Sequence, residues 1–196
     1  MEVGQSRVFL VGLMGAGKST VGHLLAARLG CAYVDNDTAV AAIAGRSTVA
    51  LAGQGGTVLH DWESRYVRSL PARTPPVVAG VPASTADLPH DLALLADSGL
   101  LVYLRADVAT LVARVSQDPP RPWLHGDPRA LITGQYARRD PVLTAAARLV
   151  LDATLPASAL AAQLVKALDQ AATAGAPPGQ GVAEADGSEN VGSVDS

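Results

Sequence analysis

A glycine-rich segment that ends in a lysine and two hydroxyl residues is the part of this chain best suited to chemistry. Residues 12–20 read G-L-M-G-A-G-K-S-T, the spacing G-x-x-x-x-G-K-S of a phosphate-binding loop. Glycines let several backbone amides face one anion, and a helix beginning near Lys18 adds the positive end of its dipole. We expect Lys18 to reach the β- and γ-phosphates of a nucleotide and the Ser19 hydroxyl to bind Mg²⁺. The predicted nucleotide-binding residues of the loop are Gly15, Ala16, Gly17, Lys18, Ser19 and Thr20.

The segments around this loop decide between a phosphate site and an ordinary strand-to-helix turn. Four apolar residues, 8–11, precede Gly12 and predict a short buried strand. Val21, Leu24, Leu25 and Leu29 then recur at helical spacing. A strand, a glycine-rich turn and a helix in this order favour the phosphate-binding loop.

Strands and helices alternate along the rest of the chain. Apolar runs predict further strands at 31–34, 77–79, 100–104 and 149–151. The predicted helices cover 38–44, 47–71 with glycine interruptions, 84–98, 107–115, 129–147 and 158–170. This alternation indicates an α/β fold, a parallel sheet with helices on both faces. The carboxylates of Asp35 and Asp37 follow the second strand, at the sheet edge where such folds hold their active sites.

The composition favours one compact domain over residues 1–170, with 48% hydrophobic residues in the whole chain. Residues 117–128 are rich in proline and predict a lid loop. Residues 171–196 combine glycine, alanine and four acidic residues with no lysine or arginine, and we expect them to be disordered.

Charge and cysteine content exclude several classes of function. The net charge is −3 and no basic stripe is visible, so we expect no nucleic-acid partner. Cys31 is the only cysteine, which excludes an internal disulfide. The first apolar run is too short for a signal peptide or a membrane span, so we expect a cytoplasmic protein without a membrane partner.

Five motifs in order resemble the shikimate kinases, a family of P-loop proteins similar to nucleoside monophosphate kinases. They are V-F-L-V-G-L-M-G-A-G-K-S-T at 8–20, D-x-D at 35–37, G-R-S at 45–47, R-P-W-L at 121–124 and R-R-D-P at 138–141. The resemblance implies a P-loop NTPase three-layer sandwich whose five-stranded parallel sheet has the order 2-3-1-4-5. It also implies a substrate-binding helical region at about 37–71, a lid, ATP and Mg²⁺ as cofactors, and a monomer. The implied activity is phosphorylation of the 3-hydroxyl of shikimate, a small molecule of aromatic amino-acid biosynthesis.

The resemblance also assigns roles to single residues. Asp37 matches the carboxylate that orients the substrate hydroxyl, and the alternative is that it is a helix N-cap. Asp35 matches a Mg²⁺ partner that acts through water, and the alternative is that it is a solvated acidic residue of a turn. Arg121 matches the lid arginine at the transferred phosphoryl group, or is merely a solvated loop residue. Arg139 matches the partner of the shikimate carboxylate, and Arg114 matches the arginine that stacks on adenine. The implied catalytic residues are Lys18, Asp37 and Arg121.

Two positions depart from the family pattern, both in the substrate half. His60 stands where the family has a second carboxylate-binding arginine, with a partly exposed helix residue as its alternative. Gly80 is the only one left of three consecutive glycines that approach the substrate, and Pro82 removes an amide donor nearby. Two other functions therefore stay open: a kinase for another small polyol or cyclitol, and a catalytically weak nucleotide-binding protein.

Overall fold

The structure, a computed structural model, describes residues 6–117 and 127–174. Its five strands form one parallel sheet in the order β2-β3-β1-β4-β5, which confirms the expected fold class and strand order. The strands are β1 (Arg7–Val11), β2 (Tyr33–Val34), β3 (Val77–Val81), β4 (Leu100–Arg105) and β5 (Leu149–Asp152).

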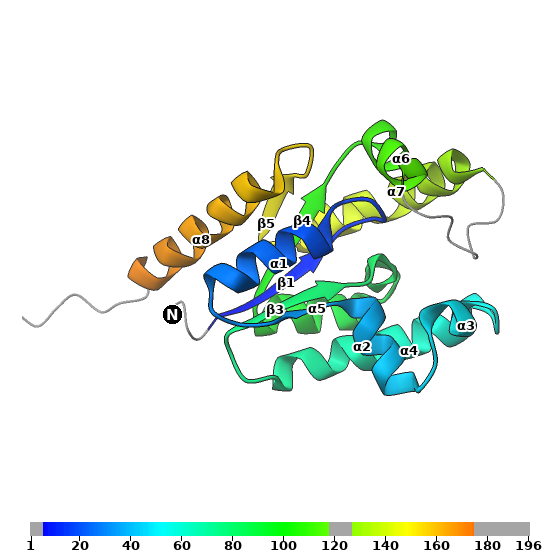
Figure 1. Cartoon of the computed structure of the whole chain (residues 1–196), viewed down its shortest axis with the longest axis horizontal. Coiled ribbons are helices and arrows are strands. Elements are labelled where there is room, and N and C mark those ends of the chain that lie inside the picture. The colour runs from blue at the N-terminus through cyan, green and yellow to red at the C-terminus, as the bar shows by residue number, and fades with distance from the viewer. Residues whose placement is uncertain (1–5, 118–126, 175–196) are drawn as a thin grey trace, which may run out of the picture.

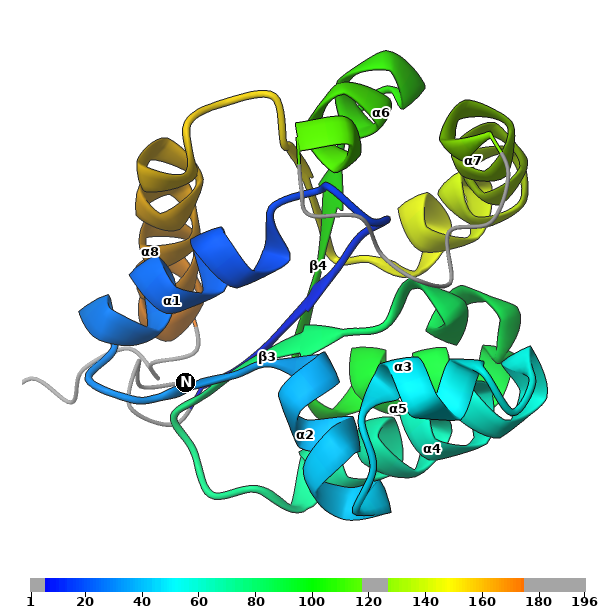
Figure 2. The ribbon, with the colours of Figure 1, turned by 45° about the vertical axis from the view of Figure 1, so that its right-hand side comes forward.

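Helices cover both faces of the sheet and form the outer layers of a three-layer sandwich (Figures 1 and 2). On one face α1 packs against α8, and on the other α5 and α7 contact β4. Helices α2 to α4 form a group at the lower right of Figure 1, where α2 contacts β3 and α4 contacts α5. The helices are α1 (Lys18–Arg28), α2 (Asn36–Ala44), α3 (Thr48–Ala52), α4 (Gly56–Ser69), η2 (Leu70–Ala72), η3 (Ala83–Asp87), α5 (Pro89–Ser98), α6 (Val108–Gln117), α7 (Pro128–Ala146) and α8 (Ala157–Ala174).

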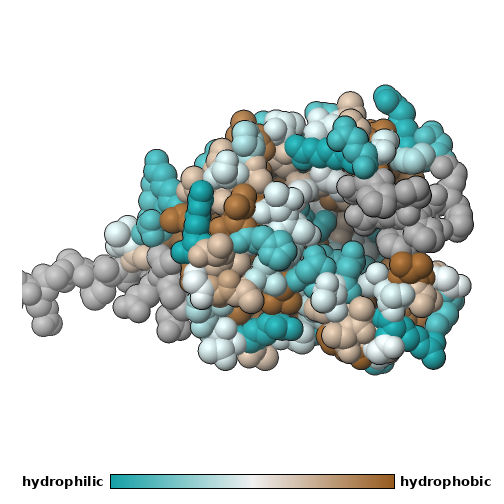
Figure 3. Space-filling view, in the orientation of Figure 1, coloured by the Kyte–Doolittle hydropathy of each residue, from teal (hydrophilic) through white to brown (hydrophobic). Residues whose placement is uncertain are grey.

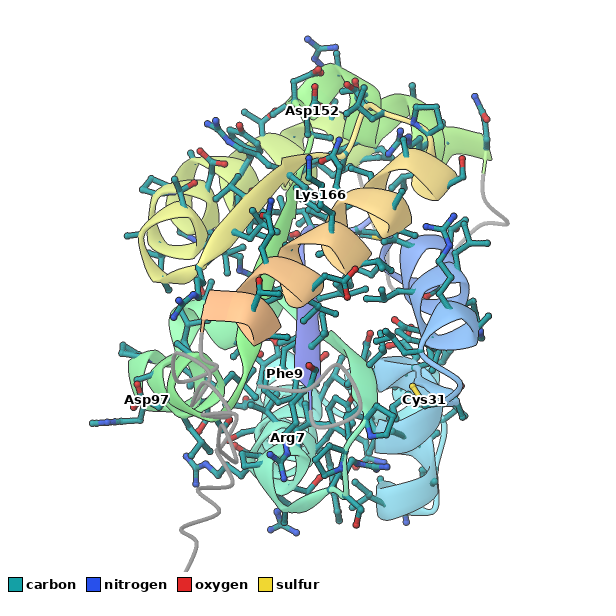
Figure 4. The ribbon with its side chains drawn as sticks, turned by 90° about the vertical axis from the view of Figure 1, so that its left-hand side faces the viewer. Arg7, Phe9, Cys31, Asp97, Asp152 and Lys166 are labelled. Atoms are coloured by element: carbon teal, nitrogen blue, oxygen red, sulfur yellow. The ribbon has the colours of Figure 1, made fainter. Side chains whose placement is uncertain are left out.

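The central strand β1 lies at the middle of the core. All four residues from Val8 to Val11 are fully buried, which explains why the strand is a continuous apolar run. Figure 4 shows α8 crossing in front of β1, where Phe9 lies. Among the described helices, none combines the length and the hydropathy needed to cross a membrane.

Several element boundaries differ from the sequence predictions, three of them in helices near the site or the tail. The single helix expected at 84–98 is divided into η3 and α5, because Pro89 keeps Leu88 out of the helical conformation (φ −124°, ψ 83°). Helix α2 begins two residues early, at Asn36. Helix α8 continues to Ala174, so the first residues of the expected disordered tail are helical. The proposed lid, apart from its ends, and the tail beyond 174 lie outside the described residues.

Large hydrophobic side chains at the surface are scattered over many elements. On the face that Figure 3 shows, hydrophobic residues of the described chain form small groups separated by hydrophilic ones. Within residues 6–117 and 127–174, the exposed large hydrophobic residues are Leu24, Ile43, Val49, Leu94, Leu131, Val142, Val150 and Leu155. Their scatter resembles an ordinary solvent-facing surface rather than a large continuous interface.

Candidate active site at the carboxyl edge of the sheet

A cavity of about 730 Å³ opens at the carboxyl edge of the strands. The phosphate-binding loop forms one wall, and the first residues of α2 with part of α4 form another. Residues after β3, two arginines from α6 and α7, and the segment from β5 to α8 complete the lining. Ligands of open parallel sheets bind at this edge, so the fold brings the predicted residues to the expected place.

The phosphate-binding loop has the backbone shape that an anion site requires. Gly15 and Gly17 have φ angles of 81° and 88°, a region that side chains with a Cβ rarely adopt. Gly17 immediately precedes α1, so the free amides of the helix start face the cavity side of the loop. The Lys18 ammonium donates hydrogen bonds to the carbonyl oxygens of Gly12 at 2.7 Å and Leu13 at 3.4 Å. These bonds hold its charge beside the amides.

Asp35 links the loop to the second strand. The Ser19 hydroxyl donates to Asp35 Oδ2 at 3.0 Å. Asp35 Oδ1 accepts from the backbone amides of Asp37 and Thr38, both at 3.1 Å, and therefore caps α2. The alternative interpretation of Asp37 as a helix N-cap is therefore wrong, because Asp35 is the N-cap of α2. Asp37 lies in the first turn of α2, where it is exposed and lines the cavity.

The oxygen atoms beside Ser19 fit a magnesium ion. A hydroxyl and a carboxylate 3.0 Å apart are hard oxygen donors, and Mg²⁺ is commonly held by few protein groups together with nucleotide phosphates. Among the described residues, no group of three or more His, Cys, Asp or Glu side chains could hold a metal by itself. The donor set therefore suits an ion that arrives with the nucleotide.

Tyr33 is a part of this region that sequence reasoning missed. Its Oη atom is buried and has no hydrogen-bond partner among the described residues. Burial raises the pKa of the phenol well above its usual range. The neighbouring Ser19 hydroxyl offsets part of this rise, and the Asp35 and Asp37 charges add to it. Its ring packs edge-on to His23, with the ring centroids 4.8 Å apart. A tyrosine two residues before a D-x-D motif is the one sequence signal for it.

Arg114 lies in the cavity wall between the phosphate-binding loop and the segment after β5. Its guanidinium donates to the carbonyl oxygens of Gly15 at 3.3 Å and Ala153 at 2.8 Å. These bonds tie α6 to the phosphate-binding loop and to the segment after β5, and all three residues line the cavity. A planar cation at this wall is suited to stack on an aromatic base.

Arg139 projects from α7 into the opposite half of the cavity. Its side chain is only 8% exposed, and it forms an ion pair with Asp87, the last residue of η3. The next residue, Asp140, anchors α7 to β4 through two hydrogen bonds from Arg105, at 2.7 and 2.9 Å, and one from Tyr103. The hydrogen bonds from Arg105 hold the pKa of Asp140 below its usual range, and Tyr103 adds to this effect.

Glu63 and His60 form the helical wall of the same half. Ser84 donates to Glu63 Oε2 at 2.5 Å. Burial raises the pKa of Glu63 and outweighs the Ser84 hydrogen bond and the charges of His60 and Arg139, which lower it. His60 is an exposed residue of α4, as its alternative interpretation holds, and it also lines the cavity.

Most predicted site residues therefore meet in one cavity, with two exceptions. Gly80 is buried in β3 and is absent from the lining, because the Tyr33 side chain occupies the space over its α-carbon. Arg121 lies outside the described residues. Sequence reasoning also missed Ser84 and Asp87, because both were placed on a predicted helix, where neither has a motif to mark it.

Comparison with known proteins shows the family of the chain. A family model described as shikimate kinase matches residues 14–169. A shikimate kinase of Cupriavidus pinatubonensis is 35% identical over 84% of this chain and 86% of that protein. A shikimate kinase of Halorhodospira halophila is 38% identical over 83% of this chain and 93% of that protein.

Solved structures give the same result at the level of the fold. A shikimate kinase from Acinetobacter baumannii in complex with shikimate superposes with a TM-score of 0.78 at 25% identity, covering 85% of this chain and 94% of that one. A gluconokinase from Sinorhizobium meliloti, at 16% identity and a TM-score of 0.61, shares the fold alone, over 87% of this chain and 95% of that one. The match over residues 14–169 and the identity to these relatives show that the chain belongs to the shikimate kinase family.

Proposed function

We propose that this protein transfers the γ-phosphoryl group of ATP to the 3-hydroxyl of shikimate. The observation that carries the proposal is the cavity itself. It joins a phosphate-binding loop, the Asp37 carboxylate and the buried Arg139 guanidinium at one edge of the sheet. The family of the chain and the shikimate complex of its structural neighbour support the same acceptor.

The donor half of the cavity would hold the nucleotide. The loop amides and Lys18 would bind the β- and γ-phosphates, and Arg114 would contact the base. Mg²⁺ would be held by the Ser19 hydroxyl and, through water, by Asp35, where its charge offsets that of the phosphates. Arg121 remains the predicted cation at the transferred group.

The acceptor half would place shikimate between α4 and α7. Arg139 would pair with its carboxylate, and Asp37 would accept a hydrogen bond from the reacting hydroxyl. Phosphoryl transfer draws most of its rate from positioning and charge stabilisation, so a carboxylate at Asp37 suffices to orient the nucleophile.

The test is an assay of the purified full chain with ATP, MgCl₂ and shikimate. ADP release is followed by a coupled enzyme assay, and the product is identified by ³¹P NMR. Replacing Lys18 by Met should lower kcat/KM by roughly a hundredfold or more, because it removes a charge from the transferred group. Lys166→Met is the matched control, since Lys166 is exposed on α8, outside the cavity (Figure 4). Absence of turnover at millimolar shikimate would contradict the proposal.

A second acceptor class has an observation in its favour. The His60 imidazole cannot make the bidentate contact of an arginine at the acceptor wall, and Arg139 is paired with Asp87. A neutral polyol or cyclitol would not need a strong carboxylate site. If a panel of such acceptors gave a higher kcat/KM than shikimate, this second class would replace the first.

We also infer a cytoplasmic monomer with a single kinase domain over residues 1–170. The scatter of exposed hydrophobic side chains supports the monomer. Size-exclusion chromatography with light scattering measures the oligomeric state, and a concentration-independent dimer would contradict it.

A further inference from the structure

The guanidinium of Arg139 is bound along one side only. Its Nε and Nη2 atoms both donate to Asp87 Oδ2, at 3.0 and 2.5 Å. An arginine side chain carries five N–H donors, so one carboxylate oxygen uses two of them. Within the described residues the guanidinium makes no other hydrogen bond, although the residue lines the cavity. The donors of Nη1 are therefore available to a ligand.

Asp87 is itself held in place by the elements around it. It ends the short helix η3, which packs against α4, α5 and α7. The same helix is tied to α4 by the hydrogen bond from Ser84 to Glu63. Figure 2 shows α7 beside the segment that follows β3, and Asp140 fixes α7 to β4 from the next position. The ion pair thus joins two firmly packed elements.

The difference in burial between the two side chains indicates that Asp87 supports Arg139. Arg139 is 8% exposed, and a guanidinium buried to this extent is costly without a partner. Asp87 is 41% exposed and could be solvated without Arg139. Burial raises the pKa of Asp87, but the hydrogen bond and charge of Arg139 outweigh it and lower the pKa overall, so the carboxylate stays ionised. The arginine depends on the aspartate more than the reverse.

We propose that Asp87 is a positioning residue for acceptor recognition: it holds the Nε–Nη2 side of Arg139 so that the Nη1 side meets the carboxylate of the acceptor. This inference rests on the proposed function, because it takes the acceptor to be a carboxylic acid. One fixed side and one free side would let a single arginine bind the substrate anion in a defined orientation.

The test compares Asp87→Ala and Asp87→Asn in the full chain with two acceptors, shikimate and its neutral methyl ester. Asp87→Ala should raise KM for shikimate about tenfold and leave kcat within about twofold, because ground-state binding is lost and the reacting groups are untouched. Asp87→Asn keeps one acceptor oxygen, so its rise should be smaller, about threefold. KM for the ester and for ATP should stay at the wild-type values.

The matched control is Asp91→Asn, which weakens the ion pair of Asp91 with Arg68 outside the cavity. This variant should change the melting temperature alone. Calorimetric titration with shikimate gives a second readout that does not need turnover, and its Kd should follow KM.

Three outcomes would overturn the inference. KM for shikimate could fall in both Asp87 variants, which would make Asp87 a competitor of the substrate. It could rise equally for shikimate and the ester, or stay constant while only the melting temperature falls. If the wild-type chain neither binds nor phosphorylates shikimate, the proposed function fails first and the inference with it.

Discussion

Tyr33 and Gly80 should be energetically coupled, because the phenol lies over the α-carbon of the glycine. A Cβ added to Gly80 would lie 2.3 Å from Tyr33 Oη, far inside van der Waals contact. The next contacts, 3.1 Å to Asn36 Oδ1 and 3.3 Å to Tyr33 Cζ, are only tight. The ring has little room to retreat, because a Cβ at Gly22 would meet it at 2.2 Å. Almost all of the clash therefore comes from one hydroxyl group.

These distances give a double-mutant cycle with a definite sign. Tyr33→Phe removes a buried hydroxyl without a partner among the described residues, so it should raise stability by up to about 1 kcal/mol. Gly80→Ala should cost about 1–3 kcal/mol in the wild-type chain, the usual cost of overpacking a core. In the Tyr33→Phe chain the shortest contact becomes 3.1 Å, so the same substitution should cost less than about 1 kcal/mol.

Urea unfolding of the four proteins measures the coupling, which should be about 1–2 kcal/mol in favour of the double variant. With an m-value of about 1–3 kcal/mol/M, the shift of the urea midpoint caused by Gly80→Ala should differ by roughly 1 M between the wild-type and Tyr33→Phe backgrounds. Equal costs of Gly80→Ala in both backgrounds would refute the reasoning. A loss of stability in Tyr33→Phe would show that the hydroxyl has a partner.

Three further substitutions test the site. Asp35→Ala should lower the free energy of unfolding by about 1 kcal/mol because α2 loses its cap, whereas Asp35→Asn should keep the cap. Both variants should raise the Mg²⁺ concentration needed for ATP binding, measured by calorimetry. An unchanged Mg²⁺ dependence would show that Asp35 is not part of the metal site. Burial raises the folded-state pKa of Glu63 above its usual value, so the contribution of Glu63 to stability is present at lower pH and is lost as pH rises through that folded pKa. The melting temperature of Glu63→Gln should therefore increase relative to that of the wild type as pH rises above 4.5. A difference in melting temperature that does not change with pH would contradict this. His60→Arg should lower KM for shikimate about tenfold with little change in kcat, because it adds a charge-assisted contact to the acceptor wall, and steady-state kinetics with an unchanged KM would argue against a carboxylate there.

The strands were predictable because each is a continuous apolar run between polar segments. Such runs are what a strand covered on both faces requires, and β1 is fully buried from Val8 to Val11. Their order in the sheet was not a local property, and it came from the family resemblance. The break between η3 and α5 had a visible signal in Pro89, since the residue before a proline avoids the helical conformation.

The two halves of the site differed in how far sequence could predict them. The phosphate-binding loop is one continuous segment whose glycines, lysine and serine act within a few residues of one another. The acceptor half joins residues that are far apart in the chain. Ser84 lies 21 residues from Glu63, and Asp87 lies 52 residues from Arg139. Such pairs depend on packing that no local pattern encodes.

The two halves should also respond differently to substitution. A change in the phosphate-binding loop acts directly on phosphate contacts, because neighbouring residues share one anion. The acceptor half has several supports, so a substitution in α4 can be offset by contacts from η3 and α7. Near His60, Glu63 accepts a hydrogen bond from Ser84, and Arg139 has its own partner in Asp87. Substitutions at His60 and Asp87 should therefore change acceptor affinity independently of ATP affinity, as expected for two half-sites that share a cavity but few direct contacts.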